Sequence, residues 1–398
     1  MVWKDDLKEE KMHRFLFERR PSPNFQELEE VLKGKKEPKK VYFVELGVDQ
    51  EVVRFITENM LGERWVLPPE RLMGRSAARE KASFDESEEK FWKQYINFYY
   101  RMGYDYVPGG GPLPRLDMYT PKVRIGDDTA ILSRGKRTWV EETRGVITSW
   151  EDFEKFPWEK MNSAIENYDF DRYDKFLREN LPEGMKVMIG GSLYEQVLER
   201  LLGYEGLFYS LYDQPDLVEA VFNAWGKIIY KLYQSLVPLE SVGGIFHADD
   251  LGYKTATMLK PDILRKLVFP WFKRYASLAH SYGKMYWYHC CGNVLEVMED
   301  LIEEVKIDAF HSFQDEIIPV GEFKRRYGDR IAVLGGVDMD KLARLNEEDL
   351  RKYVRGILNE CMPGRFALGS GNTVANYIPV KNYLIMLEEG LRWKSSSC

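Results

Sequence analysis

The chain has 398 residues, of which 44% are hydrophobic and 14% aromatic, so it can bury a large core. Its net charge is −7, and no basic patch interleaved with aromatic residues occurs, which argues against nucleic-acid binding. No run of about 18 apolar residues occurs, so no membrane span is predicted. A charged N-terminus without an apolar signal core, and four cysteines without a disulfide framework, predict a cytoplasmic protein with reduced thiols.

The first part of the chain predicts a mixture of elements. Residues 1–40 are polar and charged, and we expect them to form an N-terminal extension. Residues 41–47 (VYFVELG) are β-branched and aromatic and end at glycine, which predicts a strand. Residues 88–103 have the spacing of an amphipathic helix, and 104–107 form a short strand before a glycine loop. Residues 122–148 alternate in polarity and carry turn residues, which predicts a β-hairpin insertion.

From residue 186 onward, strands and helices alternate regularly. The further strands are KVMIGG (186–191), GGIFHADD (243–250), MYWYHCC (285–291), DAFHSF (308–313), RIAVLGG (330–336) and RFALGSG (365–371). Strands separated by helices of about 12 or more residues predict parallel βαβ units. Eight such units favour a closed barrel over an open sheet. The predicted fold is therefore α/β, a single (β/α)8 TIM-barrel domain over residues 1–398 that includes the extension and the hairpin insertion.

Rare polar residues stand where the predicted strands end. In a barrel of this kind the active site lies at the carboxyl ends of the strands. The residues at these ends are His247, Asp249, Asp250, His289, Cys290, Cys291, His311, Gln314, Asp338 and Asn372. Three of the five histidines thus fall on three successive strands. The alternative is that each histidine is a satisfied core or loop residue.

His289 and Cys291 are two residues apart on a strand, so both side chains are expected to face the barrel interior while Cys290 points outward. Imidazole and thiolate are preferred zinc ligands, but a catalytic zinc needs a third protein ligand. His247, Asp249 and Asp250, on the preceding strand, are candidates for it. A Cys290–Cys291 disulfide and a nucleophilic Cys291 with His289 as its base remain alternatives.

The carboxylates carry a second interpretation. Asp249 and Asp338 are placed to bind polar substrate groups or to move a proton. Asp249 and Asp250 alternate sides if the strand continues, so only one of them would face inward. Asp250 has the alternative role of capping the next segment.

Five stretches carry a family resemblance: GGSLYEQVLERLLGYEGLFYSLYDQPDLVEAVF (190–222), DDLG (249–252), YHCCGN (288–293), GGVD (335–338) and GSGNTVANYIPVKNYLIMLEEG (369–390). On these motifs residues 185–395 resemble the uroporphyrinogen decarboxylase superfamily, and most nearly its methylcobamide:thiol methyltransferase and corrinoid-dependent O-demethylase branch. The resemblance implies a (β/α)8 barrel and a zinc ion held by His289, Cys291 and a cysteine that follows a Gly-X-Gly. Here Asn372 follows Gly369-Ser370-Gly371, so an amide replaces the expected third ligand.

The resemblance implies an enzyme that moves a methyl group between a small thiol, methyl ether or amine and a corrinoid. It also implies that a partner protein carries the corrinoid. The expected catalytic residues are His289, Cys291, Asp249 and Asp338, and the expected substrate-binding residues are His247, Tyr253, His311, Gln314 and Asn372. Two alternatives stay open. A tetrapyrrole decarboxylase would use Arg115, Arg137 and Arg144, although the arginine-rich N-terminal motif of that branch does not occur. A non-catalytic barrel would bind a corrinoid or another small molecule.

Overall fold

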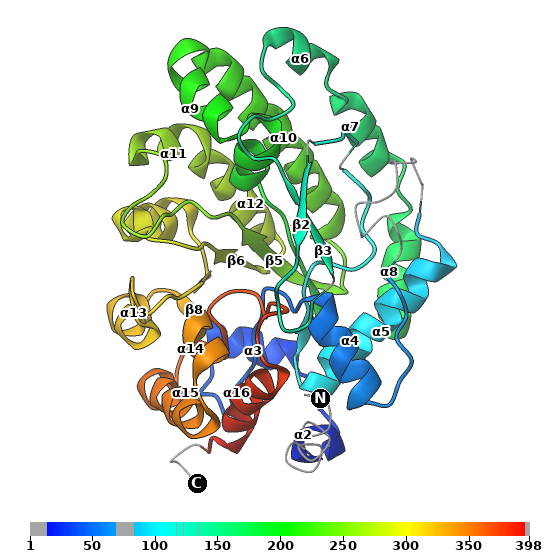
Figure 1. Ribbon diagram of the computed structural model, residues 1–398, viewed down its shortest axis with the longest axis vertical. Helices are drawn as coiled ribbons and strands as arrows, with labels where there is room; N and C mark the ends of the chain where they lie inside the picture. The colour runs from blue at the N-terminus through cyan, green and yellow to red at the C-terminus, as the bar shows by residue number, and fades with distance from the viewer. Residues whose placement is uncertain (1–13, 69–82, 117, 122, 134, 395–398) are drawn as a thin grey trace.

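The computed structural model describes residues 14–68, 83–116, 118–121, 123–133 and 135–394 (Figure 1). Its centre is a curled, seven-stranded sheet in which all neighbouring strands are parallel, in the order β1-β4-β5-β6-β7-β8-β9. The strands are β1 (Tyr106–Val107), β4 (Lys186–Ile189), β5 (Val242–Ala248), β6 (Met285–His289), β7 (Ala309–His311), β8 (Ala332–Val337) and β9 (Phe366–Ser370). Strand order follows chain order, as expected for successive βα units.

Helices connect these strands and cover the outer face of the sheet (Figure 1). Before β1 lie α2 (Arg14–Glu18), α3 (Phe25–Leu32), α4 (Gln50–Asn59) and α5 (Glu86–Met102). Between β1 and β5 lie α6 (Trp150–Lys155), α7 (Trp158–Glu166), α8 (Phe170–Asn180), η2 (Gln196–Leu201), α9 (Tyr204–Asp213) and α10 (Pro215–Leu236). The remaining helices are α11 (Pro261–Leu267), α12 (Phe269–Ser281), η3 (Leu295–Val297), η4 (Asp300–Val305), α13 (Val320–Tyr327), α14 (Met339–Arg344), α15 (Glu347–Cys361) and α16 (Val380–Arg392). Among the described residues, no helix is both long and apolar enough to cross a membrane.

Residues 41–47 occupy the place of an eighth strand without forming a full one. On one side the Val44 N–H donates to the Leu368 carbonyl over 2.9 Å, and the Leu368 N–H donates to the Tyr42 carbonyl over 2.8 Å. On the other side no ladder to β1 forms in the described residues. Instead the Tyr106 hydroxyl donates to the Glu45 carbonyl over 2.6 Å and accepts from the Glu45 N–H over 3.0 Å. The prediction of a closed eight-stranded barrel is therefore confirmed only as a seven-stranded curled sheet, with a side chain bridging the seam.

Residues 1–40 were predicted to form an N-terminal extension, of which residues 1–13 lie outside the described residues. The described part belongs to the core of the fold, because α3 closes the amino-terminal end of the sheet. Its apolar residues join the inward-facing residues of the strands in one buried cluster. The Phe25 ring lies 6.2 Å from that of Trp287 on β6, and the Phe25 N–H donates to the Gly184 carbonyl over 2.8 Å. The prediction rested on the polar and charged composition of residues 1–40. An amphipathic helix packs through its apolar face, however, and the charged residues of α3 do not decide where it lies.

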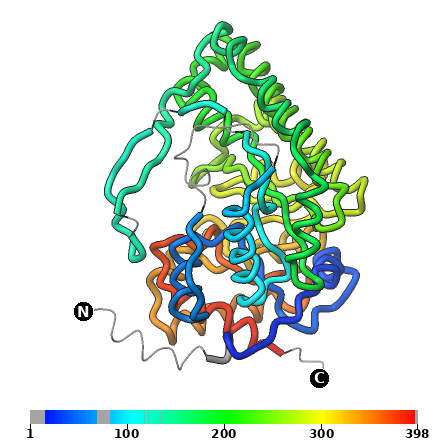
Figure 2. Tube along the Cα trace, turned by 90° about the vertical axis from the view of Figure 1, so that its right-hand side faces the viewer, coloured from blue at the N-terminus to red at the C-terminus, as the bar shows by residue number. Residues whose placement is uncertain are grey.

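The predicted hairpin insertion is confirmed as two antiparallel strands, β2 (Val123–Asp127) and β3 (Lys136–Val140). It stands away from the body of the molecule as a teal arm (Figure 2). Its tip is held to the loop after β9: the Leu132 N–H donates to the Asn376 carbonyl over 3.0 Å, and Asn376 Nδ2 donates to Asp128 over 2.9 Å. The arm therefore reaches the carboxyl-terminal end of the sheet, where the candidate site lies.

Candidate metal and active site

His289 and Cys291 lie on the inner side of the sheet, as the strand alternation predicts. Met285 and Trp287, earlier on β6, belong to the inner cluster, so positions 289 and 291 continue the same face. Cys290 lies instead in the outer cluster, where its sulfur accepts a hydrogen bond from the Leu251 N–H over 3.1 Å. The adjacent cysteines are both free thiols.

Asp250 completes a triad with these two residues. One oxygen of Asp250, Nε2 of His289 and Sγ of Cys291 all lie within 4.8 Å of one another. The Cys291 N–H donates to Asp250 Oδ1 over 2.6 Å, His289 Nε2 is 3.5 Å from the same oxygen, and Cys291 Sγ is 3.4 Å from His289 Nε2. The loops after β5 and β6 can approach this closely because they meet at two glycines: a Cβ on Gly252 would lie 2.7 Å from the Gly292 backbone.

The protonation states of the triad and its neighbours depend on burial and on the charge of Asp250. Burial raises the pKa of Asp250, but the neighbouring His289 and a hydrogen bond from the Cys291 N–H outweigh it, so this pKa is lowered and Asp250 is ionised. Burial, followed by the charge of Asp250, raises the pKa of the Cys291 thiol. Burial and the charges of Asp250 and Asp249 also raise the pKa of Glu195 to about 9, so Glu195 carries a proton at neutral pH.

These donors fit a zinc ion. Nitrogen, sulfur and carboxylate oxygen are the ligand atoms that zinc takes in proteins, and three protein ligands with an open position are typical of catalytic sites. A cation within reach of Cys291 would stabilise its thiolate and reverse the effect of burial on this thiol.

Asn372 contacts the triad through the wrong end for a metal ligand. Its Oδ1 accepts a hydrogen bond from the Thr373 N–H over 2.8 Å, which turns Nδ2 toward Cys291, and Nδ2 donates to Sγ over 3.0 Å. The amide therefore supports negative charge on the sulfur, whereas the family resemblance implies a cysteine as the third zinc ligand at this position.

His311 also lies beside the triad. Its Nδ1 is 2.6 Å from Nδ1 of His289, and its Nε2 is 3.0 Å from the Ser370 carbonyl oxygen. It is fully buried, and burial followed by the neighbouring His289 lowers its pKa well below the usual value of a histidine. The ring is therefore neutral at physiological pH and sits behind His289.

His247 and Asp249 do not reach the triad. Both are fully buried on the outer side of β5, where His247 Nε2 is 2.8 Å from Asp249 Oδ2 and its Nδ1 is 2.9 Å from the Tyr233 hydroxyl of α10. Asp249 also accepts from the Ser192 hydroxyl and from the N–H groups of residues 193 and 195 at 2.8 to 2.9 Å. These contacts hold the loop after β4 against β5. His247 and Asp249 therefore stabilise the fold at this point, whereas substrate binding was predicted for His247 and catalysis for Asp249.

Asp338 has a similar architectural position. Its Oδ1 caps α14 by accepting from the N–H groups of Asp340 and Lys341 at 2.9 and 3.2 Å. Its Oδ2 accepts from the Asp315 N–H over 2.9 Å. With three backbone donors on its two oxygens, Asp338 anchors the loop after β7 rather than facing the triad.

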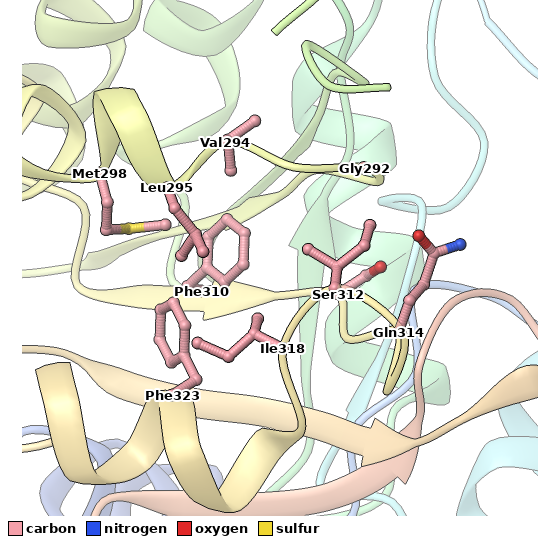
Figure 3. A pocket seen from close by; sticks show the side chains of 10 residues that line it. Gly292, Val294, Leu295, Met298, Phe310, Ser312, Gln314, Ile318 and Phe323 are labelled. Atoms are coloured by element: carbon pink, nitrogen blue, oxygen red, sulfur yellow. The ribbon is translucent and has the colours of Figure 1, made fainter. Parts of the chain in front are cut away.

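Gln314 and Tyr253 lie at the edges of the site. Gln314 is exposed and, with Ser312, borders a small hollow (Figure 3). The remaining wall is apolar and includes Phe310 and Phe323. The Ser312 hydroxyl is 3.7 Å from Cys291 Sγ, which connects this hollow to the triad. Tyr253 is 70% exposed on the loop after β5.

The sequence prediction did not assign two residues to the site: Asp250, a member of the triad, and Glu195, which lies beside it. Asp250 was weighed as a third ligand but was set behind Asp249, although Phe246 is an inner residue and the alternation from Phe246 assigns the inner face to position 250. Glu195 follows β4 in a stretch that carries part of the family resemblance, but no residue of that stretch was assigned to the site, and the folded structure brings Glu195 next to Asp250.

The chain resembles a solved structure closely enough to support the fold. No curated protein matches the chain. Among solved structures, a methyltransferase from Methanosarcina mazei superposes with a TM-score of 0.64 at 14% identity, covering 93% of this chain and 98% of that one. A B12-independent methionine synthase from Shewanella sp. W3-18-1 gives a TM-score of 0.42 at 11% identity, with 82% and 90% of the two chains covered.

The family comparison concerns the half of the chain that carries the triad residues. The family model described as Uroporphyrinogen decarboxylase (URO-D) matches residues 196–392, a range that begins just after β4 and ends at the last residue of α16. It includes Asp250, His289, Cys291 and Asn372. Residues 196–392 of this chain are therefore a domain of the uroporphyrinogen decarboxylase superfamily, as the motifs had suggested.

Proposed function

We propose that the protein is a methyltransferase that moves a methyl group between a small substrate and a corrinoid, at a zinc ion held by Asp250, His289 and Cys291. The observation that carries the proposal is the convergence of one oxygen, one nitrogen and one sulfur donor within 4.8 Å at the carboxyl end of the sheet. The fold that this chain shares with a methyltransferase supports the same class of reaction. A bound zinc would supply a Lewis acid that polarises the heteroatom of the substrate.

The residues around the triad suit the removal of a methyl group from an ether or amine. The methyl leaves the heteroatom without its bonding electrons, cobalt(I) of the corrinoid supplies the new electron pair, and the heteroatom takes up a proton. Glu195 holds a proton at neutral pH because its pKa is raised to about 9, and it lies next to Asp250. We therefore assign to Glu195 the protonation of the leaving group.

The charge distribution disfavours the decarboxylase alternative. The neighbours of Asp250 include the acidic Glu195 and Glu199, and these side chains supply no positive charge that would bind a substrate rich in carboxylates. Of the arginines considered for that role, Arg144 lies 3.7 Å from Glu205 and is 75% exposed, while Arg137 is in the exposed strand β3.

The test is anaerobic absorption spectroscopy of the cobalt corrinoid with the zinc-loaded protein. Methyl ethers, methylamines and thiols are offered in turn, with cobalt(I) cobalamin or methylcobalamin as the second substrate. We expect methyl transfer with at least one substrate, and its loss in His289→Ala, Cys291→Ser and Asp250→Asn. Cys361→Ser is the matched control, because Cys361 is a buried thiol at the end of α15 and not part of the triad.

Two outcomes would contradict the proposal. Methyl transfer that survives in all three triad variants would remove the assigned site. Tight binding of zinc and cobalamin without turnover of any substrate class would favour a non-catalytic binding barrel.

A further inference from the structure

A buried polar chain runs from the backbone of β9 to the triad. The carbonyl of Ser370 is 3.0 Å from His311 Nε2, and His311 Nδ1 is 2.6 Å from His289 Nδ1. The two histidines are 0% and 3% exposed, so no solvent competes for these contacts. A backbone carbonyl can only accept a hydrogen bond, so the hydrogen between Ser370 and His311 belongs to His311 Nε2.

This first hydrogen bond determines the second. A charged imidazolium at His311 would be fully buried with only a carbonyl and another imidazole at its ring nitrogens, which is costly without a carboxylate partner. A neutral ring that carries its hydrogen on Nε2 has a lone pair on Nδ1. The short contact to His289 therefore needs a hydrogen on His289 Nδ1, donated toward His311.

We infer that His311 is a positioning residue that fixes the tautomer of His289 and thereby turns the Nε2 lone pair of His289 toward Cys291 and Asp250. These two residues lie 3.4 and 3.5 Å from that nitrogen. The opposite tautomer would place an N–H there and close the nitrogen to a metal ion. The inference rests on the proposed function only in that a metal is the group that would use this lone pair.

The surrounding backbone positions the side chains of this hydrogen-bonded series. His289 and His311 are register partners on neighbouring strands, which sets their rings side by side. On the other side, Gly335 of β8 has a φ of +88°, and a Cβ at this position would lie 2.8 Å from His311 Nε2 and 2.5 Å from the Ser370 oxygen. Any larger residue at 335 would displace the hydrogen bond between His311 and Ser370, so glycine makes room for it.

The experiment compares cobalt(II) binding by two His311 variants. His311→Gln keeps one acceptor and one donor on a short amide, whereas His311→Phe keeps a ring of similar size but has neither. Titration followed by the visible absorption of tetrahedral cobalt(II) should show affinity about 10- to 100-fold weaker in His311→Phe, the usual cost of losing the partner of a metal-binding histidine. His311→Gln should retain most of the affinity. His280→Gln is the matched control, because His280 lies on α12 and pairs with Asp308 away from the triad.

Equal affinity in wild type, His311→Phe and His311→Gln would overturn the inference, as would an equal loss in both variants. A second measurement stands independently of metal binding and of variant folding. Long-range nitrogen–proton NMR of the metal-free wild-type protein with ¹⁵N-labelled histidine should show His289 with its hydrogen on Nδ1 and His311 with its hydrogen on Nε2. The reverse tautomer at His289 would overturn the inference. If the wild type binds no cobalt(II), the proposed metal site fails, while this spectrum still decides the tautomer.

Discussion

Asp249 and Asp250, the two adjacent aspartates that follow β5, face opposite sides of the sheet and make different contacts. Asp249 is fully buried and accepts hydrogen bonds from His247, from a serine hydroxyl and from two backbone N–H groups. Asp250 faces the other way, accepts from the Cys291 N–H and stands in the triad. Sequence adjacency says nothing about this difference, but the alternation of a strand does.

Substitution by asparagine should separate the two roles. Asp249→Asn should lower the free energy of unfolding by about 1 to 3 kcal/mol, because buried donors lose a charged acceptor. Asp250→Asn should leave unfolding nearly unchanged but weaken zinc binding, because it removes the only carboxylate of the triad. Denaturant unfolding and zinc competition with a chelating dye measure the two effects. Equal losses of zinc affinity in both variants would show that Asp249 also serves the site.

Glu45 gives the protein a pH-dependent stability. It is fully buried and accepts from the Ser370 N–H over 2.9 Å and from the Ser370 hydroxyl. Burial raises its pKa to about 8, only partly opposed by these hydrogen bonds. Because the pKa of Glu45 is higher in the folded than in the unfolded state, folding favours its protonated form. The contribution of Glu45 to the free energy of unfolding is therefore fully present below about pH 4.5 and is lost as the pH rises to 8.

The free energy of unfolding should therefore fall between pH 5 and pH 8 by up to about 1.4 kcal/mol for each pH unit on account of Glu45 alone. In Glu45→Gln this slope should be absent, because the amide is neutral throughout. Urea unfolding curves of both proteins at several pH values measure the difference. Parallel pH profiles for the two proteins would contradict the assignment of a neutral Glu45.

At the scale of elements, α3 covers the amino-terminal end of the curled sheet. Phe25 enters between the inward-facing residues: its ring stacks on Trp287, and a Cβ on Gly243 of β5 would lie 2.4 Å from it. Gly243 therefore makes room for this ring. The helix closes one end of the inner core while the triad lies at the other.

Phe25→Ala should destabilise the protein by about 3 to 5 kcal/mol, since it removes a buried ring and leaves a cavity. Glu30→Ala on the same helix, outside the buried positions of α3, should change stability little and serves as the control. Thermal unfolding of both variants provides the measurement. A similar, small effect of both changes would contradict the packing of Phe25 in the inner core.

At the scale of the whole molecule, periodicity in the sequence predicted most of the architecture. The strands from 186 onward, the long helix after residue 86 and the hairpin all occur close to their predicted positions. Closure of the barrel could not be predicted, because residues 41–47 have the composition of a strand but Tyr106 replaces the missing ladder with its hydroxyl. That substitution depends on the distance between two segments about 60 residues apart, which local patterns do not encode.

The candidate site was predicted in part, for a physical reason that differs from residue to residue. His289 and Cys291 follow from strand alternation, and His311 stands on the next strand at the same level. His247 and Asp338 were assigned to the site because polar residues at strand ends suggest chemistry, yet one is held in the outer layer and the other caps a helix. Asn372 lies beside Cys291, at the position where the motif suggested a ligand, but its orientation depends on a hydrogen bond from the Thr373 N–H.

The most direct test of the central claim is X-ray absorption at the zinc edge of the zinc-loaded protein. The triad predicts one sulfur at about 2.3 Å, from Cys291, and nitrogen or oxygen ligands at about 2.0 to 2.2 Å, from His289, Asp250 and one exchangeable group. The sulfur contribution should disappear in Cys291→Ser. A shell with two sulfurs, or zinc that stays bound with the same spectrum in Cys291→Ser, would contradict a metal site built from Asp250, His289 and Cys291.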